Sequence, residues 1–319
     1  MNRLKNIIYG VAVGDAVGVP YEFNSRTEMQ EEPCEDMIGF GTYHQPAGSW
    51  SDDTSLTLCL LDAICYQTGK IDFDKAKQNF IDWCFNHKFT ANNVRFDIGN
   101  TTFQAIRRMK RGTNLFSCGS KENTCNGNGS LMRISPLIPL LVNMKNIEDR
   151  FQLVEKVSCM THGHVISIVG CHIYCEIMVN LWNDMDKFDA VSKAVAILKE
   201  FYEDKNEIPF DISYKDAFYQ YERIFSKDFA SLPEKQILSH GYVLATLEAS
   251  LWSFLNAKDY KETVLLSVNL GDDTDTTAAI AGSMAGLYYG MKSIPDSWIS
   301  TLLNKELIDE TIKKAEGEA

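Results

Sequence analysis

The sequence lacks several features that would assign it to common classes of protein. No stretch approaches the about 20 consecutive apolar residues that a membrane-spanning helix needs, and Asp15 interrupts the first apolar run too early for a secretory leader. None of the nine cysteines forms a C-x-x-C pair, and 31 Lys and Arg face 43 Asp and Glu, for a formal net charge of −12. We therefore expect a cytoplasmic protein with reduced thiols that binds neither membranes nor nucleic acid.

Alternating strand patterns are almost absent, and helical periodicity dominates instead. Apolar side chains recur at spacings of three or four along Phe73, Ala76, Phe80 and Trp83. The same reasoning predicts helices over residues 55–66, 151–160, 165–182, 190–202, 242–255 and 260–269. Residues 37–43 are the best candidate for a strand. The sequence therefore predicts an all-α fold and argues against a βαβ sheet.

Three irregular stretches interrupt this pattern, at residues 28–49, 110–130 and 203–215. Loops of this length inside a compact domain are often functional. None has the composition of a linker between domains, and the chain has no internal repeat. We expect one domain over residues 1–319, present as a monomer or a weak homo-oligomer.

Two acidic clusters lie at opposite ends of the chain. The first is Ser-Asp-Asp-Thr at residues 51–54, and the second is Asp-Asp-Thr-Asp-Thr at residues 272–276. One acid is enough to cap a helix, whereas three acids within four residues repel each other unless a cation neutralises them. Carboxylates and hydroxyls are the ligands that hard divalent cations prefer. If folding brings the clusters together, we expect a metal site in preference to two helix caps.

Two segments of the chain are rich in small residues. Gly282, Gly286 and Gly290 recur every four positions after the second cluster, which predicts a central helix that another backbone approaches closely. Residues 14–18 form a second small-residue segment, and Glu22 follows it in an apolar setting. An isolated Glu is more often exposed. For Glu22 we give equal weight to a second possibility, that its side chain supplies a carboxylate to the metal centre or to a water beside it.

A glycine-rich turn at residues 126–130 precedes an expected helical run from Leu131. Free backbone amides in such a turn suit a phosphate or diphosphate, although a simple loop before a helix looks the same. The pattern is neither a P-loop nor a dinucleotide fingerprint. Of His162 and His164, we expect one to contact substrate and the other to be structural. Asp97 is either a helix cap or a carboxylate that faces the substrate.

Together these motifs resemble the ADP-ribosylglycohydrolase family, which includes the enzyme that reactivates ADP-ribosylated dinitrogenase reductase and the ADP-ribosyl-arginine hydrolases. The resemblance is carried by residues 14–18 with Glu22 and Phe23, and by residues 46–54, 97–101, 127–133, 161–162 and 273–276, in family order. Two positions depart from the family pattern. Gly271-Asp272 stands where Gly-Gly is common, and Ser51 replaces a threonine found in several relatives.

The resemblance implies an all-α fold with a central cleft that holds two divalent cations, Mg²⁺ or Mn²⁺. The matching metal ligands are Ser51, Asp52, Asp53, Asp273, Asp275 and Thr276. The matching substrate contacts are Asp97, Gly127, Asn128, Gly129, Ser130, Met132, His162 and Tyr242. Within this set, the glycine turn would cradle the diphosphate and inner ribose, and Tyr242 would lie near the adenosine. Glu22 matches the acid beside the metals.

The implied reaction is hydrolysis of the N-glycosidic bond between ADP-ribose and a modified side chain, most plausibly arginine. Asp52, Asp53, Asp273 and Asp275 would hold two cations beside the ribose diol, where a polarised water attacks. The candidate catalytic residues are Glu22, Asp53, Asp97 and Asp275. Glu22 or a cluster Asp would take the proton, and Asp97 would help to open or orient the sugar. Alternatives are release from serine, cleavage of free ADP-ribose derivatives, a non-catalytic crystallin-like protein, and a nucleotide diphosphate hydrolase.

Overall fold

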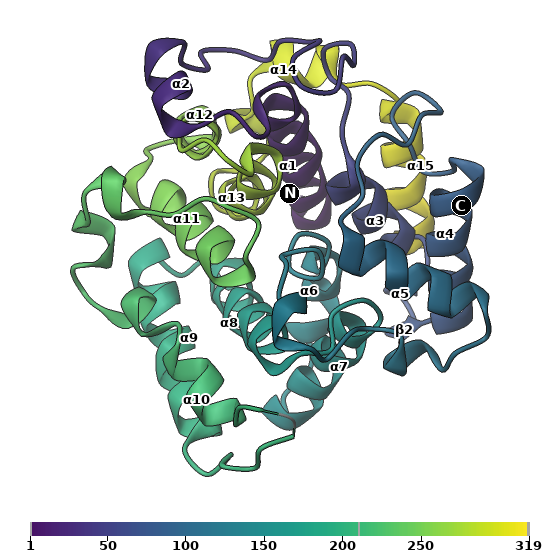
Figure 1. Cartoon of the computed structure of the whole chain (residues 1–319), viewed down its shortest axis with the longest axis vertical. Helices are drawn as coiled ribbons and strands as arrows, with labels where there is room; N and C mark the ends of the chain where they lie inside the picture. Colours follow the sequence, from purple (N-terminus) through teal and green to yellow (C-terminus); the bar gives the residue numbers. More distant parts are fainter. Residues whose placement is uncertain (1, 210, 318–319) are drawn as a thin grey trace.

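Helices carry most of the chain, as the apolar periodicity predicts (Figure 1). The computed structural model describes residues 2–209 and 211–317. The longer helices are α1 (Arg3–Gly18), α3 (Asp52–Leu61), α4 (Phe73–Asn86), α5 (Asn100–Lys110), α7 (Ile147–Cys159), α8 (Val165–Trp182), α9 (Lys187–Tyr202), α11 (Val243–Asn256), α12 (Tyr260–Asn269), α13 (Thr274–Tyr289) and α15 (Lys305–Glu316). The short helices are α2 (Arg26–Glu31), α6 (Ile138–Leu141), α10 (Tyr214–Tyr219) and α14 (Asp296–Thr301).

Helices α1 and α13 form the centre of the fold, although they come from opposite ends of the chain (Figure 1). A Cβ atom on Gly10 would lie only 2.3 Å from the carbonyl oxygen of Gly282, and one on Gly286 only 2.3 Å from that of Asn6. A Cβ on Gly14 would lie 2.2 Å from the carbonyl oxygen of Ala278. The two helices therefore pack backbone against backbone, and the predicted close approach at residues 282 and 286 is confirmed.

This packing brings three helix ends together. The Thr274 hydroxyl, at the start of α13, donates to the carbonyl oxygen of Gly18, at the end of α1, over 2.8 Å. Asp15 on α1 accepts hydrogen bonds from the backbone N–H groups of Ser51 and Thr54, at 2.9 and 3.0 Å. The acidic starts of α3 and α13 are therefore both fixed against the end of α1.

Helix α8 runs through the interior and is apolar on all sides. Among the described residues it alone is long and apolar enough to cross a membrane, but 94% of it is buried inside the protein. A helix that is hydrophobic all round and enclosed by other helices is a core helix. Helices α7, α9, α10 and α11 pack around it.

The predicted strand at residues 37–43 is wrong. Phe40 has a φ of +77°, which breaks an extended run, and no partner strand lies beside this segment in the described chain. The small sheet instead pairs β1 (Ile64–Cys65) with β2 (Lys70–Ile71), antiparallel. Strands of two residues are too short to produce an alternating pattern.

Several predicted boundaries also need correction. Helix α3 stops at Leu61 rather than at residue 66, because the chain turns into β1. The expected helical run from Leu131 is a turn, and regular helix begins only with a 3₁₀ segment over Ser135–Leu137 and then α6. Gly290 does not continue the small-residue face of α13 but ends the helix at φ +82°. Helix α2 occupies the start of the irregular stretch at residues 28–49.

Candidate active site

The two acidic clusters meet at the starts of α3 and α13. The Thr276 hydroxyl donates to Asp53 Oδ2 over 3.2 Å, across 223 residues of sequence. The Ser51 hydroxyl donates to the same carboxylate oxygen over 3.2 Å. Asp53 is completely buried and Asp275 is 1% exposed. The folded chain therefore places the oxygen ligands of the two clusters around one point.

Helix capping does not account for these carboxylates. The N-cap of α3 is Ser51, whose hydroxyl accepts from the backbone N–H of Asp53 at 3.3 Å. Asp273 occupies the N-cap position of α13, but its side chain makes no capping hydrogen bond. The acids are therefore surplus to the caps, as the sequence argument required.

Four buried carboxylate oxygens of the cluster have no hydrogen-bond partner among the described residues. They are Glu22 Oε2, Asp53 Oδ1, Asp273 Oδ1 and Asp275 Oδ2. An unpartnered buried carboxylate oxygen is costly unless a cation or donor satisfies it. Ligand atoms of Glu22, Asp273 and Asp275 lie within 4.8 Å of one another. This all-oxygen donor set fits a hard divalent cation, and it includes Glu22 in the cluster rather than beside it.

The electrostatics of the cluster point the same way. Burial, followed by the charges of Asp97 and Asp273, raises the pKa of Glu22 to about 9. Burial, followed by the charges of Glu22 and Asp53, raises the pKa of Asp275 well above its usual range. The protein therefore holds these carboxylates where only a nearby positive charge makes their ionised forms favourable.

Asp15 is a site residue to which the sequence analysis assigned no role. Besides the two backbone bonds at the start of α3, its Oδ2 atom accepts from the Thr54 hydroxyl at 2.6 Å. Burial raises the pKa of Asp15 to about 6, although these hydrogen bonds lower it. The Asp15 carboxylate therefore fixes the backbone at the start of α3, the segment that carries Ser51 and Asp53. The available signal was an acid within the otherwise apolar α1.

A cleft of about 470 Å³ opens over the cluster. The predicted site residues in its walls are Glu22, Asp52, Asp97, Gly127, Asn128, Gly129, Met132, His162, Asp273 and Thr276. Ser51, Asp53 and Asp275 are buried beneath this surface. Gly99 is the N-cap of α5, so Asp97 does not cap that helix and faces the cleft beside Asp52.

The glycine turn is fastened directly to the acidic cluster. The Asn128 side-chain amide donates to Asp273 Oδ2 at 2.7 Å and to the Thr246 hydroxyl at 3.0 Å. Its backbone N–H donates to the carbonyl oxygen of Gly241 at 3.1 Å. A Cβ atom on Gly129 would lie 2.8 Å from His162 Cε1, so only glycine fits there. The turn and the cluster therefore form one rigid surface.

Arg133 supports this turn from within the core. Its guanidinium is completely buried and donates to the carbonyl oxygens of Ser130 and Val157, each at 3.1 Å, and to the Thr161 hydroxyl at 2.7 Å. Thr161 Oγ1 in turn lies 2.9 Å from His162 Nδ1. Burial and the charge of Arg133 lower the pKa of His162 to about 3, so this imidazole is neutral at physiological pH.

We predict that Arg133→Lys lowers the free energy of unfolding by about 3 kcal/mol, because an ammonium cannot reach all three acceptors. The affinity for ADP-ribose, the ligand that the family resemblance implies for this turn, should fall as the turn loosens. Urea unfolding and calorimetric titration measure the two effects. Arg107→Lys, on the half-buried face of α5, is the matched control and should change neither. An Arg133→Lys protein with unchanged stability would contradict this role.

Three residues that the sequence analysis considered for the site do not line the cleft with their side chains. The Ser130 hydroxyl accepts from Ser158 at 3.0 Å inside the core, so only its backbone is available to a substrate. The Tyr242 ring faces His240, and it is the neighbouring Gly241 that lines the cleft. His164 Nε2 lies 2.9 Å from Asp211, and its ring caps α8. His164 is therefore structural, and His162 lines the cleft, where its predicted contact with substrate stays a prediction.

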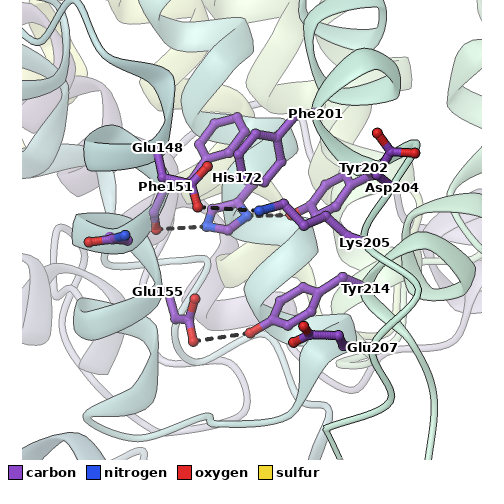
Figure 2. A pocket seen from close by; sticks show the side chains of 11 residues that line it. Glu148, Phe151, Glu155, His172, Phe201, Tyr202, Asp204, Lys205, Glu207 and Tyr214 are labelled. Carbon is purple, nitrogen blue, oxygen red and sulfur yellow. Dashed lines mark hydrogen bonds and ion pairs between the residues drawn. The ribbon is translucent and has the colours of Figure 1, made fainter.

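A second cavity, of about 280 Å³, lies between α7, α8, α9 and α10 (Figure 2). Several of its polar side chains pair with one another. His172 Nδ1 lies 2.5 Å from the Tyr202 hydroxyl, and Tyr214 donates to Glu155 at 3.0 Å (Figure 2). None of the unpartnered carboxylate oxygens of the acidic cluster faces it. The unpartnered carboxylates of the acidic cluster therefore lie at the first cleft and not at this cavity.

Comparison with known proteins supports the resemblance found in the sequence. The family model described as ADP-ribosylglycohydrolase matches residues 1–319. ADP-ribosylarginine hydrolase Tri1 of Serratia proteamaculans is 30% identical, over 97% of this chain and 77% of its own length. ADP-ribosyl-[dinitrogen reductase] glycohydrolase of Rhodospirillum rubrum is 27% identical, over 94% of this chain and 90% of its own.

A solved structure agrees with the helical architecture. A chain titled ADP-ribosylglycohydrolase-related protein complex superposes with a TM-score of 0.76 at 26% identity, covering 98% of this chain and 96% of its own. The all-α fold class is thereby confirmed. With the family model spanning every residue, the chain belongs to the ADP-ribosylglycohydrolase family.

Proposed function

We propose that this protein is a metal-dependent ADP-ribosylarginine hydrolase, which cleaves the N-glycosidic bond between ADP-ribose and an arginine side chain. The observation that carries the proposal is the group of four unpartnered carboxylate oxygens that lie in and directly beneath one cleft, beside a glycine turn. The names of two relatives, from Serratia proteamaculans and Pseudomonas putida, support arginine as the acceptor. The substrate would be an ADP-ribosylated protein or an ADP-ribose-containing small molecule.

The ligands proposed for two divalent cations, Mg²⁺ or Mn²⁺, come from both acidic clusters. They are Ser51, Asp52, Asp53, Asp273, Asp275 and Thr276, and Glu22 joins them by its position in the three-carboxylate group. Bound cations would supply the positive charge that orients the ribose hydroxyls and makes a neighbouring water easier to deprotonate. Asp15 would keep Ser51 and Asp53 in place without contacting the substrate.

The remaining steps fall to side chains that face the cleft. Loss of the guanidine leaving group gives the ribose oxocarbenium character, which the surrounding carboxylates stabilise. Glu22 has an unpartnered buried oxygen and would accept a proton from the attacking water. Asp97 would orient the sugar. The backbone amides of residues 127–132 would hold the diphosphate, with neutral His162 behind them.

The cysteines support an intracellular setting for this activity. All nine are free thiols, and seven of them are buried. Such thiols suit a reducing compartment, which is where we place the enzyme.

The proposal predicts release of free ADP-ribose and intact arginine from an arginine-linked ADP-ribosyl peptide. A chelator should lower the rate by about 100-fold or more, because the cations contribute several kcal/mol to the transition state. Arginine-, serine- and cysteine-linked peptides are incubated in parallel with Mg²⁺, with Mn²⁺ and with chelator, and products are separated by chromatography. AMP as product would identify a diphosphate hydrolase instead. Tight binding of ADP-ribose without any cleavage would identify a non-catalytic binding protein.

A further inference from the structure

Three aromatic rings from separate segments lie side by side, and one of them lines the cleft. We call Phe23, Tyr43 and Phe96 the aromatic rim. The ring centroids of Phe23 and Tyr43 are 6.3 Å apart, and those of Tyr43 and Phe96 are 5.0 Å apart. Phe23 lines the cleft beside Glu22 and remains 68% exposed. A phenyl ring in water at this position gives up the free energy that its burial would provide.

The backbone at Phe23 is also unfavourable. Its φ of +69° lies in the left-handed region, which a bulky L residue rarely adopts. A short hydrogen bond of 2.6 Å from its backbone N–H to the carbonyl oxygen of Asp272 holds this conformation. Strained residues that surrounding structure fixes in place cluster at ligand sites. The strain and the exposure together indicate that the Phe23 ring is held ready for a ligand.

The charge around the aromatic rim selects the ligand. The Tyr43 hydroxyl interacts with Glu22 and lies near Asp97, so carboxylates flank the half-buried Tyr43 beside the exposed Phe23 ring. Aromatic faces attract cations, and the planar guanidinium stacks on them better than an ammonium does. An aromatic surface beside two acids therefore favours a planar organic cation over a neutral or anionic group.

The position of the aromatic rim assigns it to one end of the substrate. Asn128 ties the diphosphate-binding turn to Asp273, whereas the aromatic rim adjoins Glu22 and Asp97. An ADP-ribose with its diphosphate on the turn and its ribose over the acidic cluster presents its leaving group to the aromatic rim. We infer that the aromatic rim is the binding site for the guanidinium of the acceptor arginine, an inference that rests on the proposed function.

The test compares Phe23→Ala with Phe40→Ala. Phe40 is 65% exposed at a φ of +77°, so it matches Phe23 in exposure and backbone, but it does not line the cleft. For Phe23→Ala we expect kcat/KM on ADP-ribosyl-arginine to fall by about 3- to 30-fold, the range of a cation–π contact. Phe23→Tyr should retain the wild-type value. Affinity for free ADP-ribose, which has no guanidinium, should stay unchanged in all variants.

A binding measurement separates this inference from the proposed function. With ADP-ribose and Mg²⁺ present, acetyl-arginine amide should bind the wild type more tightly than its neutral isostere acetyl-citrulline amide. Phe23→Ala should abolish that preference and Phe40→Ala should keep it. Equal binding of the two amides by the wild type overturns the inference, and so does an equal loss of ADP-ribose affinity in Phe23→Ala. Failure of the wild type to cleave ADP-ribosyl-arginine overturns the proposed function, while the amide preference still decides the inference.

Discussion

Replacing Asp275 with asparagine should lower kcat by about 1000-fold and remove most of the bound divalent cation. Asp275 is 1% exposed, and its Oδ2 atom has no partner among the described residues. The substitution keeps the shape of the side chain but removes a charge and one oxygen ligand. In chelator, the variant should be at least as stable as the wild type, because it relieves repulsion among buried carboxylates. Only the wild type should gain stability when Mg²⁺ or Mn²⁺ is added.

Metal content, turnover and thermal unfolding with and without cation measure these effects together. Asp272→Asn is the matched control, since Asp272 is a neighbouring acid that faces solvent. Asp272 has a φ of +60°, a region that asparagine tolerates well, so this variant should keep full activity. Full activity and normal metal content in Asp275→Asn would remove the proposed metal centre.

Part of the candidate site followed from charge and periodicity, and the resemblance to the family added most of its residues. Residues 51–54 and 272–276 contain more acids than helix capping uses, and this surplus predicted a metal site on the condition that folding brings the two clusters together. The helices that carry a long apolar face, such as α8 and α12, matched their predicted ranges because burial repeats every three or four residues. Gly282 and Gly286 predicted close backbone contact for the same kind of local reason.

The features that the sequence did not reveal depend on long-range geometry. The glycine face of α13 did not identify its partner, because nothing in residues 278–286 specifies α1. Asp15 looks like an isolated acid until folding places the start of α3 against it. Tyr43 lies in an irregular segment where no periodicity applies, so its place beside Glu22 emerged only in three dimensions.

The contact between α1 and α13 gives a second large prediction, for Gly18→Ala. A Cβ atom on Gly18 would lie 2.4 Å from the Asp275 Cα and 2.5 Å from its backbone nitrogen. Backbone atoms cannot rotate away, so the two helices must separate, at a cost of about 2–4 kcal/mol in unfolding free energy. The separation also moves Asp275 and strains the 2.8 Å hydrogen bond from Thr274 to Gly18. A displacement of about 1 Å in a catalytic group costs about 100-fold in rate. The molecules that still fold should therefore also have a lower turnover.

Gly10→Ala separates the effect on the site from the effect on the fold. Its added Cβ would lie 2.3 Å from the Gly282 carbonyl oxygen, a clash of the same kind, but about 12 Å along α1 from Gly18. Both variants should lose similar stability in urea unfolding. Gly99→Ala, whose added Cβ meets no atom within 4 Å, should lose only the about 1 kcal/mol that alanine costs at a helix N-cap. Only Gly18→Ala should also lose cation affinity and turnover per folded molecule. If Gly10→Ala and Gly18→Ala lose activity only in proportion to their unfolded fractions, the position of Asp275 does not depend on this helix contact. A selective loss in Gly18→Ala would mean that the glycine face of α1 sets the geometry of the acidic cluster as well as the packing of the core.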